Sequence, residues 1–154
     1  MTGVQTCALP IYGVFLAVPA RQREKLVDGQ RHLTLTGWDR NNYSILKLRT
    51  DVVVLQMANA DVTDESLKPL QQMKALQELD LSGTQVSDAG LELLKDLPAL
   101  SRLRLARTKI TNKGFQDALF AKDSLMSLDL SGTQVSRETV QEWRNIKPGR
   151  RAIR

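Results

Sequence analysis

Four segments of this chain repeat one pattern at a nearly constant spacing, and this periodicity restricts the fold more than any other feature. The segment that begins at Leu55 recurs at Leu79 and Leu103, each time 24 residues later, and at Leu128 after a further 25. The letters SGTQVS occur unchanged at 82–87 and 131–136. Periods of roughly 20–50 residues are typical of solenoids, in which each unit buries its apolar face against the next. We therefore expect a stack of similar coils.

Each repeat predicts a short strand, a turn and a short helix. Leu-x-Leu places both leucines on one face of a strand, and the following Ser-Gly suits a turn because glycine accepts positive φ. Helix N-caps are expected at Thr63, Ser87, Thr111 and Ser136, and Pro69 is expected to distort the first helix. The helical residues expected to be buried are Leu91, Leu94 and Leu97 in the second copy and Val140, Trp143 and Ile146 in the fourth. Stacking then requires Leu55, Leu79, Leu103 and Leu128 to form rungs of one parallel sheet.

The pattern Leu-x-x-Leu-x-Leu-x-x-Thr-x-Val/Ile-Thr/Ser-Asp-x-Gly-Leu, seen in Leu76–Leu91 and Leu100–Phe115, resembles leucine-rich repeats. The variant with Thr84, Thr108 and Thr133 is similar to short repeats of bacterial proteins, notably of planctomycete type. This resemblance covers about residues 52–146. It implies an α/β solenoid with parallel strands on the concave face and short helices on the convex face, and it leaves the identity of the partner open.

Residues between the leucines are expected to line the concave strand face, where a protein partner would bind. These candidate binding residues are Gln56, Asn59, Glu78, Asp80, Arg102, Arg104, Arg107 and Asp129. In-register pairing would place Arg104 between Asp80 and Asp129, so an internal charge ladder is the favoured interpretation there. Arg107 has Gly83 and Gly132 as expected neighbours and no acid in register, so partner binding is favoured for it.

The two ends of the chain differ from the repeats. Residues 1–50 and 147–154 each carry a net charge of +4, whereas residues 51–146 carry −3. Residues 1–11 match the translation of a common short-read sequencing adapter, so we interpret them, Cys7 included, as foreign to the native chain. In the segment 12–30, the apolar Tyr12–Ala20 precedes basic residues, which fits the end of a signal peptide, the end of a membrane anchor, or the start of a soluble helix.

Residues 31–51 are expected to cap the repeats or to form a degenerate first one. Arg31–Gly37 and Ile45–Leu48 alternate like strands, with a turn at 38–42 between them that holds Trp38. At the other end, residues 147–154 are expected to form a basic C-terminal cap, because the ends of a solenoid need a polar cover.

Composition argues against most catalytic chemistry. The chain has one Cys and one His, and His32 alternates with leucines in a strand pattern, so we expect no catalytic, metal or cofactor site. An acidic central body does not favour nucleic-acid binding. We expect a monomeric, non-enzymatic protein-binding module, as a fragment of a longer protein. The alternatives are a structural spacer for a missing catalytic or membrane domain and a binder of anionic surfaces through the basic ends. The compartment stays open between secreted or periplasmic, membrane-anchored and cytoplasmic.

Overall fold

The computed structural model describes residues 21–36 and 43–154, in which strands and helices alternate along the chain. The strands are β1 (Arg21–Val27), β2 (Gln30–Thr36), β3 (Val52–Gln56), β4 (Glu78–Asp80), β5 (Arg102–Arg104), β6 (Ser127–Asp129) and β7 (Arg151–Ile153). The helices are the 3₁₀ helices η1 (Ser44–Leu48) and η2 (Asp64–Gln72) and the α-helices α1 (Asp88–Leu94), α2 (Asn112–Ala118) and α3 (Arg137–Ile146). Over this part of the chain, every helix is too short or too polar to cross a membrane. The adapter-like segment, Tyr12–Ala20 and Trp38 lie outside the described residues.

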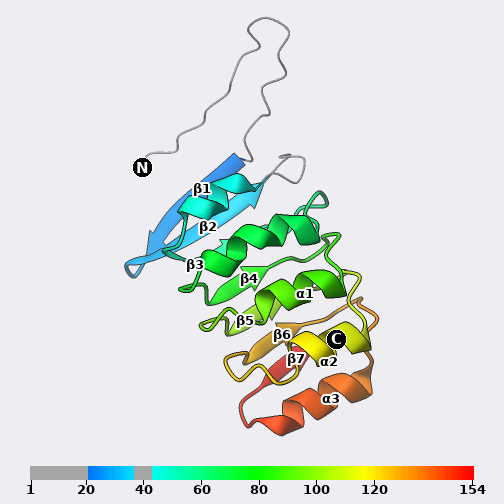
Figure 1. Ribbon diagram of the computed structural model, residues 1–154. Coiled ribbons are helices and arrows are strands. Elements are labelled where there is room, and N and C mark those ends of the chain that lie inside the picture. The colour runs from blue at the N-terminus through cyan, green and yellow to red at the C-terminus, as the bar shows by residue number, and fades with distance from the viewer. Residues whose placement is uncertain (1–20, 37–42) are drawn as a thin grey trace, which may run out of the picture.

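One sheet joins the seven described strands in chain order (Figure 1). Strands β1 and β2 are antiparallel, and each later pair from β2 to β7 is parallel. Along the parallel part the register partners are Leu33, Leu55, Leu79, Leu103 and Leu128, followed by Ala152. The five leucines are at most 2% exposed. The predicted rungs of one parallel sheet are therefore confirmed.

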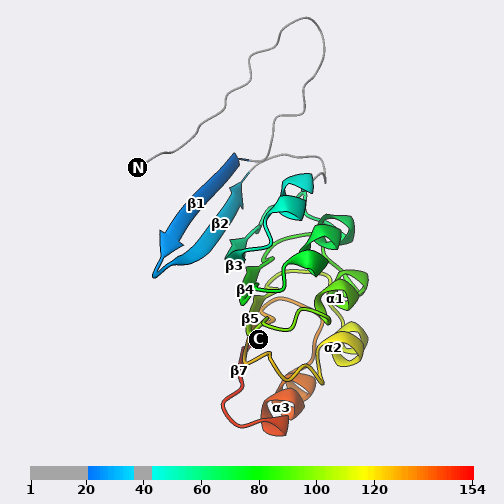
Figure 2. The same cartoon turned by 60° about the vertical axis from the view of Figure 1, so that its left-hand side comes forward.

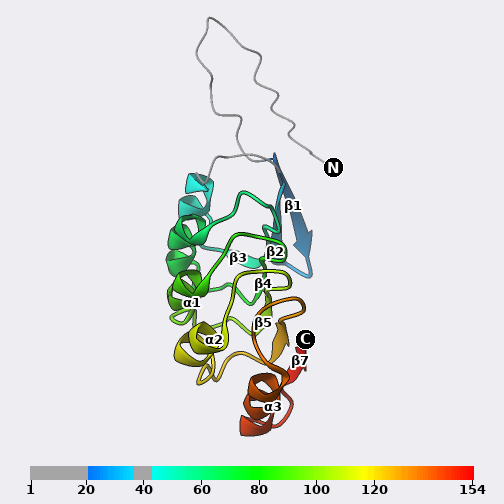
Figure 3. The ribbon, with the colours of Figure 1, turned by 90° about the vertical axis from the view of Figure 1, so that its right-hand side faces the viewer.

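The helices stand in a column on one side of the parallel strands (Figure 2), and the side view shows the same two layers (Figure 3). The apolar core fills the space between these layers. Of the predicted core residues, Leu91, Leu94, Leu97 and Trp143 are fully buried and Val140 is 6% exposed. The expectation for Ile146 is wrong, because this side chain is 53% exposed. Ile146 ends α3, and among the described residues no later helix packs against it.

The local signals act as the repeats predicted. Thr63, Ser87, Thr111 and Ser136 each precede a helix as its N-cap, and Pro69 lies inside η2, which is a 3₁₀ helix and not an α-helix. The repeat threonines serve their own coil: the hydroxyl of Thr84 donates to Leu81 O at 2.7 Å, and Thr108 donates to Leu105 O at 2.6 Å. These buried hydroxyls thus satisfy turn carbonyls that would otherwise lack a partner.

Acidic residues at the helix starts join neighbouring coils. The carboxylate of Asp64 accepts hydrogen bonds from the backbone N–H and hydroxyl of Ser87, at 2.8 and 2.6 Å. Asp88 does the same for Thr111, at 2.8 and 2.6 Å. The sequence predicted only a favourable position in the helix dipole for these carboxylates. Their contacts show a second role, because each carboxylate fixes the start of the next helix.

The N-terminal edge differs from its prediction. Arg31–Gly37 was expected to be a strand, and β2 covers it as far as Thr36, but Ile45–Leu48 forms η1 and is no strand. The partner of β2 in a hairpin is β1, joined through Asp28 and Gly29, which both have positive φ. The basic residues Arg21–Lys25 thus belong to a strand. An alternation of only four residues is too short to separate a strand from a helical turn, and packing of η1 beside η2 decides the outcome.

The basic C-terminal segment is built into the stack. Residues 151–153 form β7 and extend the sheet beyond β6. Arg150, expected in a polar cover, is only 5% exposed. Its guanidinium donates to Trp143 O at 3.1 Å and to Lys122 O at 3.0 Å, and it lies 4.5 Å from the centre of the Trp143 ring. Burial lowers the pKa of Arg150 from its ordinary value. The segment closes the core with one buried cation as well as with solvated charges.

Candidate functional site

The sheet face that points away from the helices is the candidate binding surface, and we call it the strand face. Two rows of side chains cross it, and each row takes one residue from every coil. The first row is His32, Val54, Glu78, Arg102, Ser127 and Arg151, and the second is Thr34, Gln56, Asp80, Arg104, Asp129 and Ile153. The register predicted for the candidate residues of the repeats is therefore confirmed. Whether these residues bind a partner is a separate matter.

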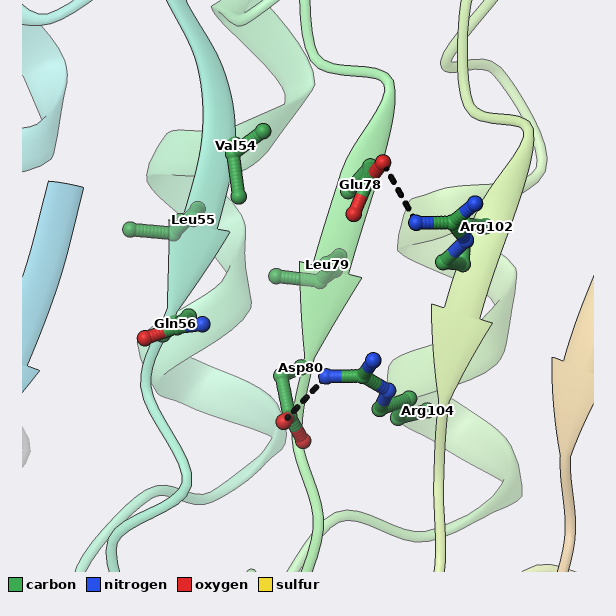
Figure 4. A pocket seen from close by; sticks show the side chains of 8 residues that line it. All are labelled: Val54, Leu55, Gln56, Glu78, Leu79, Asp80, Arg102 and Arg104. Carbon is green, nitrogen blue, oxygen red and sulfur yellow. Dashed lines mark hydrogen bonds and ion pairs between the residues drawn. The ribbon is translucent and has the colours of Figure 1, made fainter. Parts of the chain in front are cut away.

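Two ion pairs connect neighbouring strands on this face (Figure 4). The guanidinium of Arg102 lies 2.8 Å from a carboxylate oxygen of Glu78, and that of Arg104 lies 3.4 Å from Asp80. The arginine side chains are about half exposed, so each pair contributes only about 0.2–1 kcal/mol. The predicted charge ladder therefore exists between β4 and β5.

The second acid predicted beside Arg104 has a different partner. Asp129 is in register with Arg104, but its carboxylate accepts a hydrogen bond from Ser131 N at 3.0 Å. Asp80 makes the equivalent contacts with Ser82, at 3.0 Å to the backbone N–H and 2.7 Å to the hydroxyl. Both carboxylates thus stabilise the turn that follows their own strand. Arg104 pairs only with Asp80 among the described residues.

The centre of the strand face is slightly hollowed. The hollow holds about 210 Å³ of empty volume that merges with solvent. Its lining residues are Val54, Leu55, Gln56, Glu78, Leu79, Asp80, Arg102 and Arg104. A shallow, charged hollow of this kind offers no enclosed apolar pocket for a small molecule, whereas a broad polar face can meet another protein.

Beside the two rows, the turn after each strand presents one more position. Asn59, Gly83, Arg107 and Gly132 occupy it in successive coils. The Asn59 side chain donates to Leu35 O at 2.8 Å, so this candidate binding residue also ties the turn to the preceding coil. Gly83 and Gly132 both have φ of +71°, and Arg107 adopts a similar φ of +56°. Arg107 is exposed, and within residues 21–36 and 43–154 its side chain has no hydrogen bond or ion pair.

Sequence reasoning missed the two ends of this surface. His32 and Thr34 continue the rows on β2, and Arg151 and Ile153 continue them on β7. A signal for β7 was present, because Arg151-Ala152-Ile153 follows Ser127-Leu128-Asp129 by 24 residues. Ala152 stands in the place of the leucine, which hid the match. No group of three or more His, Cys, Asp or Glu side chains that could hold a metal ion occurs among the described residues.

A parallel sheet on one side, a helix in most coils on the other and one leucine rung per strand define the class of α/β solenoids. A family model described as Leucine Rich repeat matches residues 73–95, which is one coil from the end of η2 to α1. Together with the structural neighbours below, this match supports a leucine-rich repeat fold for the chain. A search of curated proteins finds no match to this chain.

Solved structures of two leucine-rich repeat proteins resemble the chain. An internalin C2 from Listeria monocytogenes has a TM-score of 0.52 and 25% sequence identity, over 70% of this chain and 44% of the internalin. Leiomodin-1 Actin-Binding Site 2 has a TM-score of 0.52 and 18% identity, over 68% of this chain and 69% of the leiomodin chain. The chain thus spans less than half of the internalin, and the likeness concerns the fold.

Proposed function

We propose that this chain binds a protein partner through its strand face, as a monomer and without catalysing a reaction. The proposed contact residues are Gln56, Asn59, Glu78, Asp80, Arg102, Arg104, Arg107 and Asp129. One observation carries the proposal. Strands β3 to β6 hold six of these polar side chains in two regular rows, with Asn59 and Arg107 in the turns beside them, while the helices occupy only the opposite side of the sheet (Figure 2).

The physical basis is that the surface is rigid before any partner arrives. On strands β3 to β6 each strand-face residue lies next to a fully or almost fully buried leucine, so the backbone beneath it is fixed by the core. Ion pairs hold Arg102 and Arg104, which reduces the side-chain entropy that binding would remove. A preorganised, charged and open face favours specific contact with a protein surface over capture of a small molecule.

The comparisons support this class of function. The leiomodin-1 structure is of an actin-binding site, so a stack with this fold serves protein binding in that protein. The structure also weakens the alternative of a basic tail that binds anionic surfaces. Arg150 is buried and 151–153 form a strand, so this end of the chain has fewer free cations than its sequence suggested.

Site-directed photo-crosslinking tests the proposal. A photoreactive amino acid would replace Gln56 or Ser127 on the strand face, and Gln116 or Glu142 on the exposed helix side in matched controls. In an extract of the source organism, we expect the strand-face positions to form one protein adduct. An excess of the unmodified chain should suppress this adduct by competition. Equal adducts from the helix positions, or none from the strand face, would contradict the proposal. Sedimentation of the purified chain tests the monomer.

A further inference from the structure

The backbone at Arg107 adopts a conformation that suits glycine. Its φ of +56° lies in the left-handed region, where a Cβ atom crowds the neighbouring carbonyl. The coils before and after it place Gly83 and Gly132 at the same point, both at +71°. The turn is fixed by its hydrogen bonds to the next coil, since Arg107 N donates to Ser131 O at 2.7 Å. The fold thus imposes this backbone conformation on Arg107, and no side-chain hydrogen bond within the described residues favours it.

The arginine side chain also gains no ion pair in the described structure. Arg102 and Arg104 of the same coil are paired with acids, whereas Arg107 and the exposed Lys109 make no side-chain hydrogen bond or ion pair within the described residues. A strained and exposed residue without a structural contact is more common at functional sites than elsewhere. The geometry therefore separates Arg107 from the two arginines that serve the charge ladder.

Glycines on both sides leave space around the guanidinium. A Cβ atom on Gly83 would meet nothing within 4 Å, and the three atoms nearest to one on Gly132 all belong to Arg107, with its Cγ at 3.2 Å. The Arg107 side chain therefore extends over Gly132, with an open backbone floor beside it. An extended segment of another protein can approach the backbone closely at Gly83, where a Cβ atom would have free space, and reach the Arg107 side chain from there.

We propose that Arg107 anchors a carboxylate from an acidic, extended segment of the protein partner, which crosses the turns above Gly83 and Gly132. This inference rests on the proposed function and specifies the chemistry of the partner. Arginine forms two parallel hydrogen bonds with a carboxylate, which fixes both position and orientation. The nearby, exposed Lys109 adds a second positive charge, and the residue that it pairs with in the preceding coil is Ser87, which is not an acid.

Selection of random peptides displayed on phage, at physiological ionic strength, tests this inference on the full chain. We expect peptides selected by the wild-type chain to be enriched in Asp and Glu. The same peptides should bind the Arg107→Gly variant about tenfold more weakly, the loss expected for one charge-assisted pair. The Arg107→Glu variant should select peptides enriched in Lys and Arg. The melting temperature of Arg107→Gly should equal or exceed that of the wild type, because glycine suits the turn.

The matched control is Arg144→Gln, which removes one exposed arginine from α3 on the helix side. Peptides should bind this variant as they bind the wild type. The inference is overturned if no peptides are selected, if the selected peptides lack acids, or if Arg144→Gln weakens binding as much as Arg107→Gly. It is also overturned if binding of the chain to anionic vesicles requires Arg107 while its binding to acidic peptides does not. Strand-face crosslinks alongside any of these results would leave the proposed function standing.

Discussion

Gly114 lies directly against the carboxyl group of Asp88 in the preceding coil, and a side chain at position 114 would overlap that carboxyl group. The same arrangement occurs one coil earlier, where a Cβ on Gly90 would lie 2.5 Å from Oδ1 of Asp64. The glycine in Thr/Ser-Asp/Asn-x-Gly is therefore needed for close approach and not for a special φ. The glycine makes room for the carboxylate of the preceding coil, which accepts hydrogen bonds from the start of the helix that contains the glycine.

This close approach predicts a large effect of Gly114→Ala. The new methyl group would displace Asp88 and weaken its hydrogen bonds with Thr111, so we expect the free energy of unfolding to fall by about 2–3 kcal/mol. Urea denaturation followed by circular dichroism measures the change. Gln116→Ala, an exposed change in the same helix, is the control and should stay within about 0.5 kcal/mol of the wild type. A neutral Gly114→Ala would show that the coils do not depend on this contact.

Removal of the Asp88 carboxylate should also weaken the contact between neighbouring coils. Asp88→Ala leaves the backbone N–H and hydroxyl of Thr111 without their acceptor, so we expect a loss of about 2 kcal/mol in unfolding free energy. Asp88→Asn should cost less, because Asn112 fills the equivalent place with a 2.6 Å hydrogen bond from Ser136 N. Chemical denaturation of both variants, with the exposed Asp117→Ala as control, measures the difference. An equal loss in Asp117→Ala would point to a general charge effect.

The buried cation at the C-terminal end should be essential to the last coil. Arg150→Ala removes three carbonyl contacts and the contact with the Trp143 ring, so we expect a loss of about 2–3 kcal/mol. Thermal unfolding followed by the fluorescence of Trp143, in a Trp38→Phe background, reports on this end directly. Arg151→Ala changes the adjacent exposed residue and should have little effect. If both variants unfold alike, the segment acts only through its charge.

The N-terminus of α3 should give a small pH dependence. A hydrogen bond from its own backbone N–H, and a second from Ser136, lower the pKa of Glu138 from its ordinary value of 4.5. Its stabilising contribution is therefore complete above that value and is lost as the pH falls through the lowered pKa. At neutral pH the wild type should have a higher melting temperature than Glu138→Gln. This difference should disappear at acidic pH. Glu142→Gln, in the middle of the same helix, should show a smaller gap.

The strain at Arg107 predicts that its removal does not destabilise the fold. A left-handed conformation costs a non-glycine residue about 1–2 kcal/mol, and the greater chain entropy of glycine offsets about 0.5–1 kcal/mol of the gain. Arg107→Gly should therefore raise the unfolding free energy by up to about 1.5 kcal/mol. Denaturant titration of this variant beside Arg107→Ala, which keeps the strain, isolates the backbone contribution. A clear loss in Arg107→Gly would mean that the side chain stabilises the turn.

The strand register was predictable because the leucines alternate with the strand-face residues, and a slip of one residue would turn Leu79 to solvent. The pairing of Arg102 with Glu78 followed from that register. The pairing of Arg104 with Asp80 and not with Asp129 did not follow, because each acid accepts a hydrogen bond from the backbone N–H of the serine two residues later and the orientation of the long arginine side chain decides the outcome. The conformation of Ile45–Leu48 was also not predictable, because a pattern of four residues does not distinguish a strand from a helical turn.

The repeated sequence by itself determined the stack, its register and the order of side chains along the strand face, because only shared rungs can bury one leucine face per coil. Tertiary structure decided what depends on contacts between residues far apart in the chain. It placed Arg150 against Trp143, joined Asp88 to Thr111 and held Arg107 in the backbone conformation of a glycine. Such contacts depend on where neighbouring coils come to lie, and a single repeat does not contain that information.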